Sequence, residues 1–260
     1  MPDRADSVQG DDESANNEER VMKNQYIGDI GDYGKYSLLL ALSSEGINVG
    51  VNWYLTRDDG SNDGKYKDYL DKPDFRVYDP VVYDALKNVM MQNPRTVKDI
   101  QDHPLFSGIL FYDEMIDMTG KQSERMSKRY AWFERSLAVF QEAQLIFMDP
   151  DNGLMTGDGA GRKIAEKYIL PSEVEEYFNA GKNVVYYCHK GRRKQDAWQN
   201  YKNYMFDRMP KAKPLVLTFH KGTQRSYVFL LHDTSYDRYR EVIKRFLPRW
   251  NELFKEEWVG

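Results

Sequence analysis

Carboxylates and histidines stand at several places in the chain where their types and spacing could support chemistry. The segment 149–153 reads Asp-Pro-Asp-Asn-Gly and directly follows an apolar run, 145–148. Its two carboxylates, Asp149 and Asp151, could accept a proton, orient a water molecule or stabilise a developing positive charge. A simple turn is also rich in Asp, Pro, Asn and Gly. Sites in an α/β sheet gather where strands end, so the position of this segment favours a function.

The tripeptide His-Lys-Gly occurs twice, each time after an apolar run. It begins at His189 and at His220, and so holds two of the four histidines. Histidine exchanges a proton near neutral pH, and neighbouring Lys and Arg side chains bind phosphates. We therefore expect both histidines to act in a site, His189 in the chemistry and His220 as a substrate contact, although His220 could instead belong to a hairpin turn. The basic residues expected to contact substrate are Lys190, Arg192, Arg193, Lys221 and Arg225.

A third polar segment, 24–36, precedes an apolar pattern with helical spacing. It reads NQYIGDIGDYGKY, and its glycines, acids and lysine could present backbone N–H groups and charged side chains to a polar ligand. The alternative is local structure, with Asp32 capping the helix and the glycines forming a turn. Several such residues, where one cap would suffice, favour a binding role. The expected substrate contacts are Asn24, Tyr26, Asp29, Asp32 and Lys35, together with Asn152 of the Asp-Pro segment.

The sequence gives little support for a metal or a cofactor. A single cysteine, Cys188, excludes a cysteine-rich zinc site. The carboxylates and histidines named above offer mixed ligands, but no close pair on one helix, such as H-E-x-x-H, fixes them. The alternating glycines of 157–161 do not follow the first strand, where a dinucleotide fingerprint belongs, so we interpret them as a loop. We expect neither a metal nor a cofactor, and Mg²⁺ stays open as the alternative.

Alternating strands and helices are expected to position these residues. Strands separated by helices predict βαβ units. We expect an α/β fold, a Rossmann-like three-layer sandwich with a mostly parallel sheet and a C-terminal antiparallel strand pair. The loops after the strands would then share one edge. The apolar patterns predict strands over 47–55, 108–112, 145–148, 183–188, 215–219 and 227–231, and helices over 33–44, 81–91, 128–144, 171–180, 196–208 and 237–250.

Charge is distributed unevenly along the 260 residues, whose formal net charge is -4. Residues 1–22 hold seven acids and two arginines, which is typical of a disordered acidic tail, and we expect 23–260 to form a single catalytic domain. Residues 161–260 hold 20 Lys and Arg against 12 Asp and Glu, a balance that suits a nucleic-acid partner. No apolar run approaches the ~20 residues that cross a bilayer, and no secretion signal opens the chain. We expect a cytoplasmic protein with no membrane partner.

These motifs carry several family resemblances. Asp149-Pro150 after a middle strand, with a closing antiparallel pair, resembles class I methyltransferases that act on nucleic acids, although the aromatic residue of their Asp-Pro-Pro-Tyr motif is missing. That resemblance implies S-adenosylmethionine as cofactor. The segments 24–36 and 147–153 are similar to those of an uncharacterised group of bacterial proteins, and the chain resembles Brig-type antiphage DNA glycosylases. Asp149-Pro150 with His189 also resembles uracil-DNA-glycosylase-like enzymes.

The leading hypothesis is a DNA glycosylase that hydrolyses the N-glycosidic bond of a modified base, with a role in antiviral defence. Asp149, helped by Asp151, would stabilise the cationic sugar and orient water, while His189 would hydrogen-bond the departing base. A base in a duplex would first be flipped out. Lys190 or Lys221 could instead attack the sugar and add a lyase step. The alternatives are an S-adenosylmethionine-dependent nucleic-acid methyltransferase and a non-catalytic nucleic-acid-binding defence protein.

Overall fold

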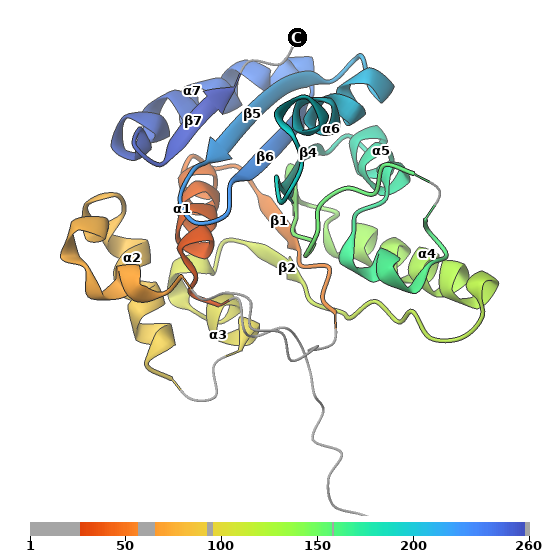
Figure 1. The fold of residues 1–260 in the computed structure, drawn as a ribbon, viewed down its shortest axis with the longest axis horizontal. Helices are drawn as coiled ribbons and strands as arrows, with labels where there is room; N and C mark the ends of the chain where they lie inside the picture. Colours follow the sequence, from red (N-terminus) through yellow and green to blue (C-terminus); the bar gives the residue numbers. More distant parts are fainter. Residues whose placement is uncertain (1–26, 57–65, 93–95, 158, 258–260) are drawn as a thin grey trace, which may run out of the picture.

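The computed structural model describes residues 27–56, 66–92, 96–157 and 159–257 (Figure 1). The predicted tail over 1–22 lies outside the described residues, and so do two of the expected substrate contacts, Asn24 and Tyr26. Within the described part, the strands form one seven-stranded sheet in the order β2-β1-β3-β4-β6-β5-β7. The strands are β1 (Val49–Asn52), β2 (Leu110–Tyr112), β3 (Leu145–Met148), β4 (Asn183–His189), β5 (Lys213–Phe219), β6 (Arg225–Leu231) and β7 (Phe254–Glu257).

The direction of the strands changes in the middle of the sheet. β2, β1, β3 and β4 are parallel, whereas β6 runs antiparallel to both β4 and β5, and β7 runs antiparallel to β5. Only three of the six pairings among the described residues are parallel. The chain is an α/β protein, but the expected mostly parallel, Rossmann-like sandwich is wrong. The connection 220–224 between β5 and β6 is too short for a crossover helix, so these two strands can pair only in antiparallel fashion.

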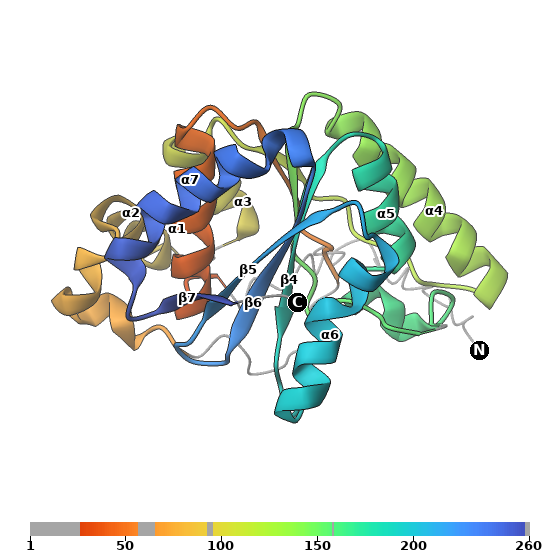
Figure 2. The same cartoon turned by 90° about the horizontal axis from the view of Figure 1, so that it is seen from above.

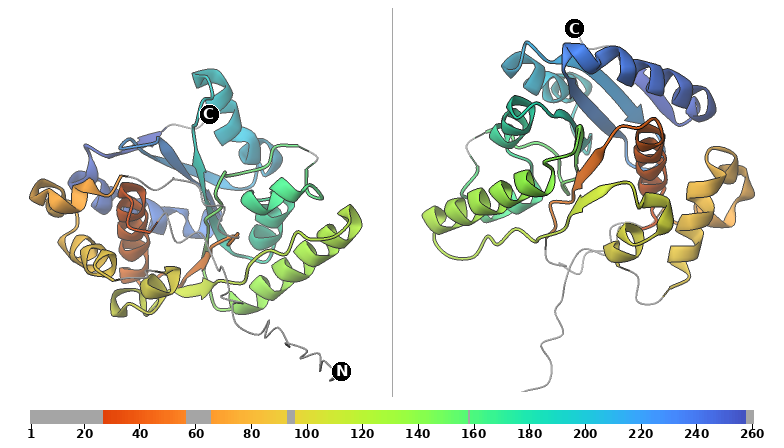
Figure 3. Two further views of the ribbon diagram at one scale, coloured as in Figure 1. Left: turned by 60° about the horizontal axis from the view of Figure 1, so that its bottom comes forward. Right: turned by 180° about the vertical axis from the view of Figure 1, so that it is seen from behind.

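Helices cover both faces of the sheet (Figure 2). One face carries α1 (Ile30–Ser44), α2 (Pro80–Met90), α3 (Val97–Gln101) and α7 (Asp233–Trp250), and the other carries α4 (Gln122–Val139), α5 (Pro171–Asn179) and α6 (Gln195–Arg208). Figure 3 shows the same separation from two further directions. Short 3-10 helices occupy Asp68–Asp71, Pro73–Val77, Pro104–Phe106 and Lys163–Lys167.

The sheet separates two apolar cores, one on each face. Side chains alternate along β3, so that Leu145 and Phe147 pack toward α1 while Ile146 and Met148 pack toward α4 and α5, all of them fully buried. A strand buried on both faces reads as a continuous apolar run, as this one does. Asp149 follows Phe147 by two residues, so the same alternation places it on the α1 face, at the point where the strand ends.

None of the helices in the described part of the chain is both long and apolar enough to cross a membrane.

The packing of β1 against α4 gives a direct test of the sheet. A Cβ atom at Gly50 would lie 2.5 Å from Cδ1 of Phe140, whereas one at Gly108 would meet nothing within 4 Å. We therefore expect Gly50→Ala to lower the free energy of unfolding by about 1–3 kcal/mol, because the aromatic ring must move out of a filled core. Gly108→Ala is the control and should stay within about 0.5 kcal/mol of the parent. Urea unfolding measures both, and equal effects would contradict this packing.

Candidate functional site

The first turn of α1 is built by two aspartates with different tasks. Asp29 caps the helix, since its carboxylate accepts hydrogen bonds from the backbone N–H groups of Gly31 at 2.6 Å and Asp32 at 3.2 Å. Asp32, which the sequence offered as the cap, instead accepts a bond from the backbone N–H of Gly28 at 3.0 Å. Gly28 has a φ of 78°, a conformation that favours glycine. The bond from Gly28 uses Oδ2 of Asp32, so its Oδ1 is available for another contact.

Lys35 connects this turn to the end of β3. Its Nζ lies 2.7 Å from Oδ2 of Asp149 and 2.9 Å from Oδ1 of Asp32. The ammonium group also lies 5.0 Å from the ring centroids of both Tyr36 and Trp53, within the range of cation–π attraction. The side chains of Lys35, Asp32 and Asp149 are only 10–14% exposed. Two segments that are distant in sequence thus share one buried lysine.

Arg225, the first residue of β6, joins the same region from the antiparallel half of the sheet. Its Nη2 donates to Oδ2 of Asp29 at 2.7 Å. Its guanidinium group lies against Gly31, where an added Cβ would fall 1.2 Å from Nη1, so a larger residue there would have to displace the guanidinium. Nη1 is buried and has no hydrogen-bond partner among the described residues.

We call Asp29, Asp32, Lys35, Asp149 and Arg225 the charged cluster. Burial alone would lower the pKa of Lys35, but attraction to Asp149 and Asp32 outweighs it, so its pKa lies well above the usual value and the amine stays protonated. Burial raises the pKa of Asp149 above its usual value, although Lys35 opposes the shift. Burial likewise raises the pKa of Asp32, opposed by Lys35 and reinforced by Asp29. The cluster holds three carboxyl groups and two bases.

His189, the last residue of β4, stands at the same edge of the sheet. It is paired in register with Arg225, and its ring centroid lies 6.4 Å from that of Tyr187. Tyr187 packs against the core on the α1 face, so the alternation along β4 puts His189 on that face as well. Asp151 is half-buried beside the end of β1, where Thr56 donates to its Oδ2 at 3.4 Å. The edge thus collects groups from α1, β1, β3, β4 and β6.

The remaining predicted site residues surround this edge at greater exposure. The hairpin 220–224 lies beside the start of α1, since a Cβ at Gly222 would approach Cγ2 of Ile30 to 3.3 Å (Figure 1). It carries His220 and Lys221, both exposed. Lys190 and Asn152 are half-buried, and Arg192 is exposed. Arg193 turns toward the opposite face, where its guanidinium lies 4.2 Å from the ring centroid of Tyr201.

Sequence reasoning missed the contribution of the residues that follow β1. Trp53 forms part of the aromatic surface around Lys35, and Thr56 contacts Asp151. Tyr54 is the one non-glycine residue of the described chain with a positive φ, 49°. Strained conformations of this kind collect at functional sites. The predicted strand over 47–55 included Trp53 and Tyr54, whereas β1 ends at Asn52, so the sequence did not single them out.

No group of three or more His, Cys, Asp or Glu side chains in the described part of the chain could hold a metal ion.

No family model matches this chain, and no curated protein matches it.

The charged cluster makes a specific prediction for stability at neutral pH. Lys35→Met should lower the free energy of unfolding by about 3–5 kcal/mol, because it leaves Asp32 and Asp149 buried without a counter-charge. The control is Lys72→Met, which removes an ion pair with Asp68 whose side chains are 56% and 70% exposed. That variant should lose less than about 1 kcal/mol. Urea unfolding at pH 7 compares them, and a loss at Lys35 no larger than at Lys72 would show that the cluster is not buried as described.

Proposed function

We propose that this chain is a DNA glycosylase, an enzyme that hydrolyses the N-glycosidic bond between a modified base and its sugar. The observation that carries the proposal is the charged cluster at the carboxyl ends of the parallel strands. With all five groups ionised it has a net charge of -1, held in a poorly solvated place. Such a site stabilises positive charge on a reacting group more strongly than water does.

Cleavage of an N-glycosidic bond matches that electrostatic preference. The sugar develops positive charge in the transition state, while the departing base takes the bonding electrons and becomes negative. Asp149 would face the cationic sugar and orient the attacking water, with Asp151 adding negative charge nearby. His189, on the same face of the sheet, would donate a hydrogen bond to the leaving base.

Lys35 supports hydrolysis rather than amine attack. Its two carboxylate partners keep it protonated, so it has no free electron pair with which to attack the sugar. It serves instead to keep Asp149 ionised and fixed in position. The exposed Lys221, and Lys190 at the end of β4, remain the candidates for a lyase step.

The nucleic acid would lie along the edge that carries the basic residues outside the charged cluster. Lys190, Arg192, Lys194 and Lys221 are all at least partly exposed there, which suits contact with a phosphate backbone. Tyr187 offers an aromatic ring for a flipped base. A base that carries a viral modification would be a natural target, which is why we also propose a role in antiviral defence.

Asp149→Asn tests the proposed chemistry. The full chain is incubated with DNAs that carry different natural base modifications, and free base is measured by mass spectrometry. We expect the parent to release one of these bases. Asp149→Asn should release it at least about 10²-fold more slowly, because the variant lacks the negative charge that faces the sugar. DNA binding, measured by fluorescence anisotropy, should be retained.

The matched control is Asp207→Asn, which removes an exposed carboxylate of α6 on the face of the sheet opposite the charged cluster and should leave release unchanged. Base release by Asp149→Asn at the parent's rate would refute the role of Asp149. Failure of the parent to release any base would overturn the glycosylase, and it would favour a binding protein if DNA binding persists. Binding of radiolabelled S-adenosylmethionine would point to a methyltransferase.

The raised pKa of Asp149 predicts how release depends on pH. The active form is the carboxylate, so the rate should fall as the pH falls through that pKa, beginning above the ~3.9 of an ordinary Asp. Lys35→Met removes the charge that opposes this shift, so the acid limb of the rate profile should move to higher pH. Lys72→Met should leave the limb in place. An unchanged acid limb in Lys35→Met would separate Lys35 from the ionisation of Asp149.

A further inference from the structure

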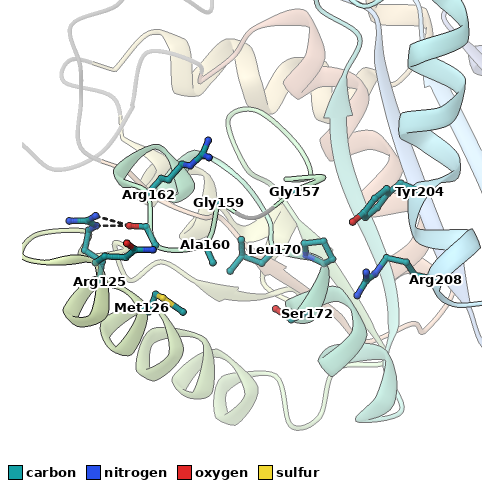
Figure 4. A pocket seen from close by; sticks show the side chains of 13 residues that line it. Arg125, Met126, Gly157, Gly159, Ala160, Arg162, Leu170, Ser172, Tyr204 and Arg208 are labelled. Carbon is teal, nitrogen blue, oxygen red and sulfur yellow. Dashed lines mark hydrogen bonds between the residues drawn. The ribbon is translucent and has the colours of Figure 1, made fainter.

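A cavity of about 640 Å³ lies on the face of the sheet opposite the charged cluster (Figure 4). It is bounded by the start of α4, the start of α5, the end of α6 and the glycine-rich loop that returns from β3. Arg125 and Met126 stand on one side of it, Tyr204 and Arg208 on the other, and Leu170 and Ser172 between them. Its volume is within the usual range for small-molecule sites, ~300–1,000 Å³.

The described residues that line this cavity carry a net positive charge. Among the described residues that line it, three are arginines, Arg125, Arg162 and Arg208, and none is acidic. Arg125 is positioned by the loop, since its Nε and Nη2 donate to the carbonyl oxygen of Gly161 at 2.9 and 2.7 Å. Arg208 pairs with Glu175, but its side chain is 44% exposed, so the pair is weak and can exchange for a phosphate. Arg162 is exposed and makes no ion pair within the described chain.

The same cavity offers apolar and aromatic surface beside the arginines. Tyr204, Met126 and Leu170 line it, and Tyr204 is half-buried. A flat ring can stack on a tyrosine, while guanidinium groups bind phosphate oxygens in pairs. Gly157, Gly159 and Gly161 add backbone to the lining without side chains of their own. The combination suits a ligand that is both aromatic and phosphorylated.

We propose that this cavity is a second binding site, distinct from the charged cluster, and that it takes a nucleotide. The base packs against Tyr204, and the phosphates face the arginines on the two sides of the cavity, Arg208 beside Tyr204 and Arg125 and Arg162 opposite. The nucleotide is either a free nucleoside phosphate or one unit of a single-stranded nucleic acid. The site does not depend on the glycosylase chemistry proposed above.

Calorimetric titration of the full chain with ADP tests the site. Adenosine and inorganic phosphate are titrated in parallel as the two halves of the ligand. We expect ADP to bind more tightly than either half, and the double variant Arg162→Gln/Arg208→Gln to lose about tenfold or more in affinity, because two charge-assisted contacts are removed. Both arginines are exposed, so the double variant should keep the parent's urea midpoint.

Arg76→Gln is the matched control, since Arg76 is an exposed arginine paired with a carboxylate, Asp84, on the other face of the molecule. It should bind ADP as the parent does. Absence of ADP binding by the parent would overturn the proposal. The proposal would also be overturned if adenosine or inorganic phosphate bound as tightly as ADP. It would be overturned as well if the double variant bound ADP as tightly as the parent.

A short single-stranded oligothymidylate distinguishes the two sources of the nucleotide. If it competes with ADP and loses affinity in the double variant, the site takes a unit of a strand. If ADP binds as predicted and the oligothymidylate does not displace it, the site takes a free nucleotide. Neither result depends on base release, so Asp149→Asn should bind ADP normally whether or not the glycosylase proposal survives.

Discussion

The contact of Lys35 with Asp149 and Asp32 is the interaction on which the rest of the edge depends. Lys35 and Asp149 are 114 residues apart in sequence, and their contact fixes the start of α1 against the end of β3. Without the lysine, two carboxyl groups would be buried with no cation in direct contact to offset their loss of water. With it, the turn that carries Asp29 is held where Arg225 can reach it. The arrangement of these charged groups therefore depends on the ammonium group of Lys35.

The reversal of β6 completes the arrangement. In a fully parallel sheet, the strand next to β4 would present its end at this edge. Because β6 runs the other way, its first residue, Arg225, stands there instead. The edge therefore combines the start of a helix, the ends of parallel strands and the start of an antiparallel strand. Side chains from these three kinds of backbone position thus lie close together.

The sequence predicted those elements whose burial is visible in their composition. The apolar runs that became β3 and β4 are examples, because a strand covered on both faces contains few polar residues. It missed β7, whose sequence Phe-Lys-Glu-Glu reads as polar because the strand lies at the edge of the sheet. The expected start of α4 was six residues late, since its first turns, Gln-Ser-Glu-Arg-Met-Ser, have no apolar stripe.

The sequence predicted individual residues of the candidate site but not which of them contact one another. Position after a strand was enough to select Asp149 and His189, and the polar turn before a helix was enough to select Asp29, Asp32 and Lys35. Nothing local states that Lys35 belongs with Asp149, or Arg225 with Asp29, because such pairs are set by the packing of distant segments. The exchange of roles between Asp29 and Asp32 was equally hidden, since either can cap a helix.

The register of the β5–β6 hairpin has a consequence for how this protein tolerates change in length. Side chains in a strand alternate between faces, so a one-residue slip of β6 would carry its first guanidinium to the opposite side of the sheet. Loops at a surface usually accept insertions. This hairpin is an exception: an added residue at 220–224 that shifted the strand would remove a cation from a buried acidic neighbour. Epitope tags or domain insertions placed there would act on the interior of the molecule rather than on its surface.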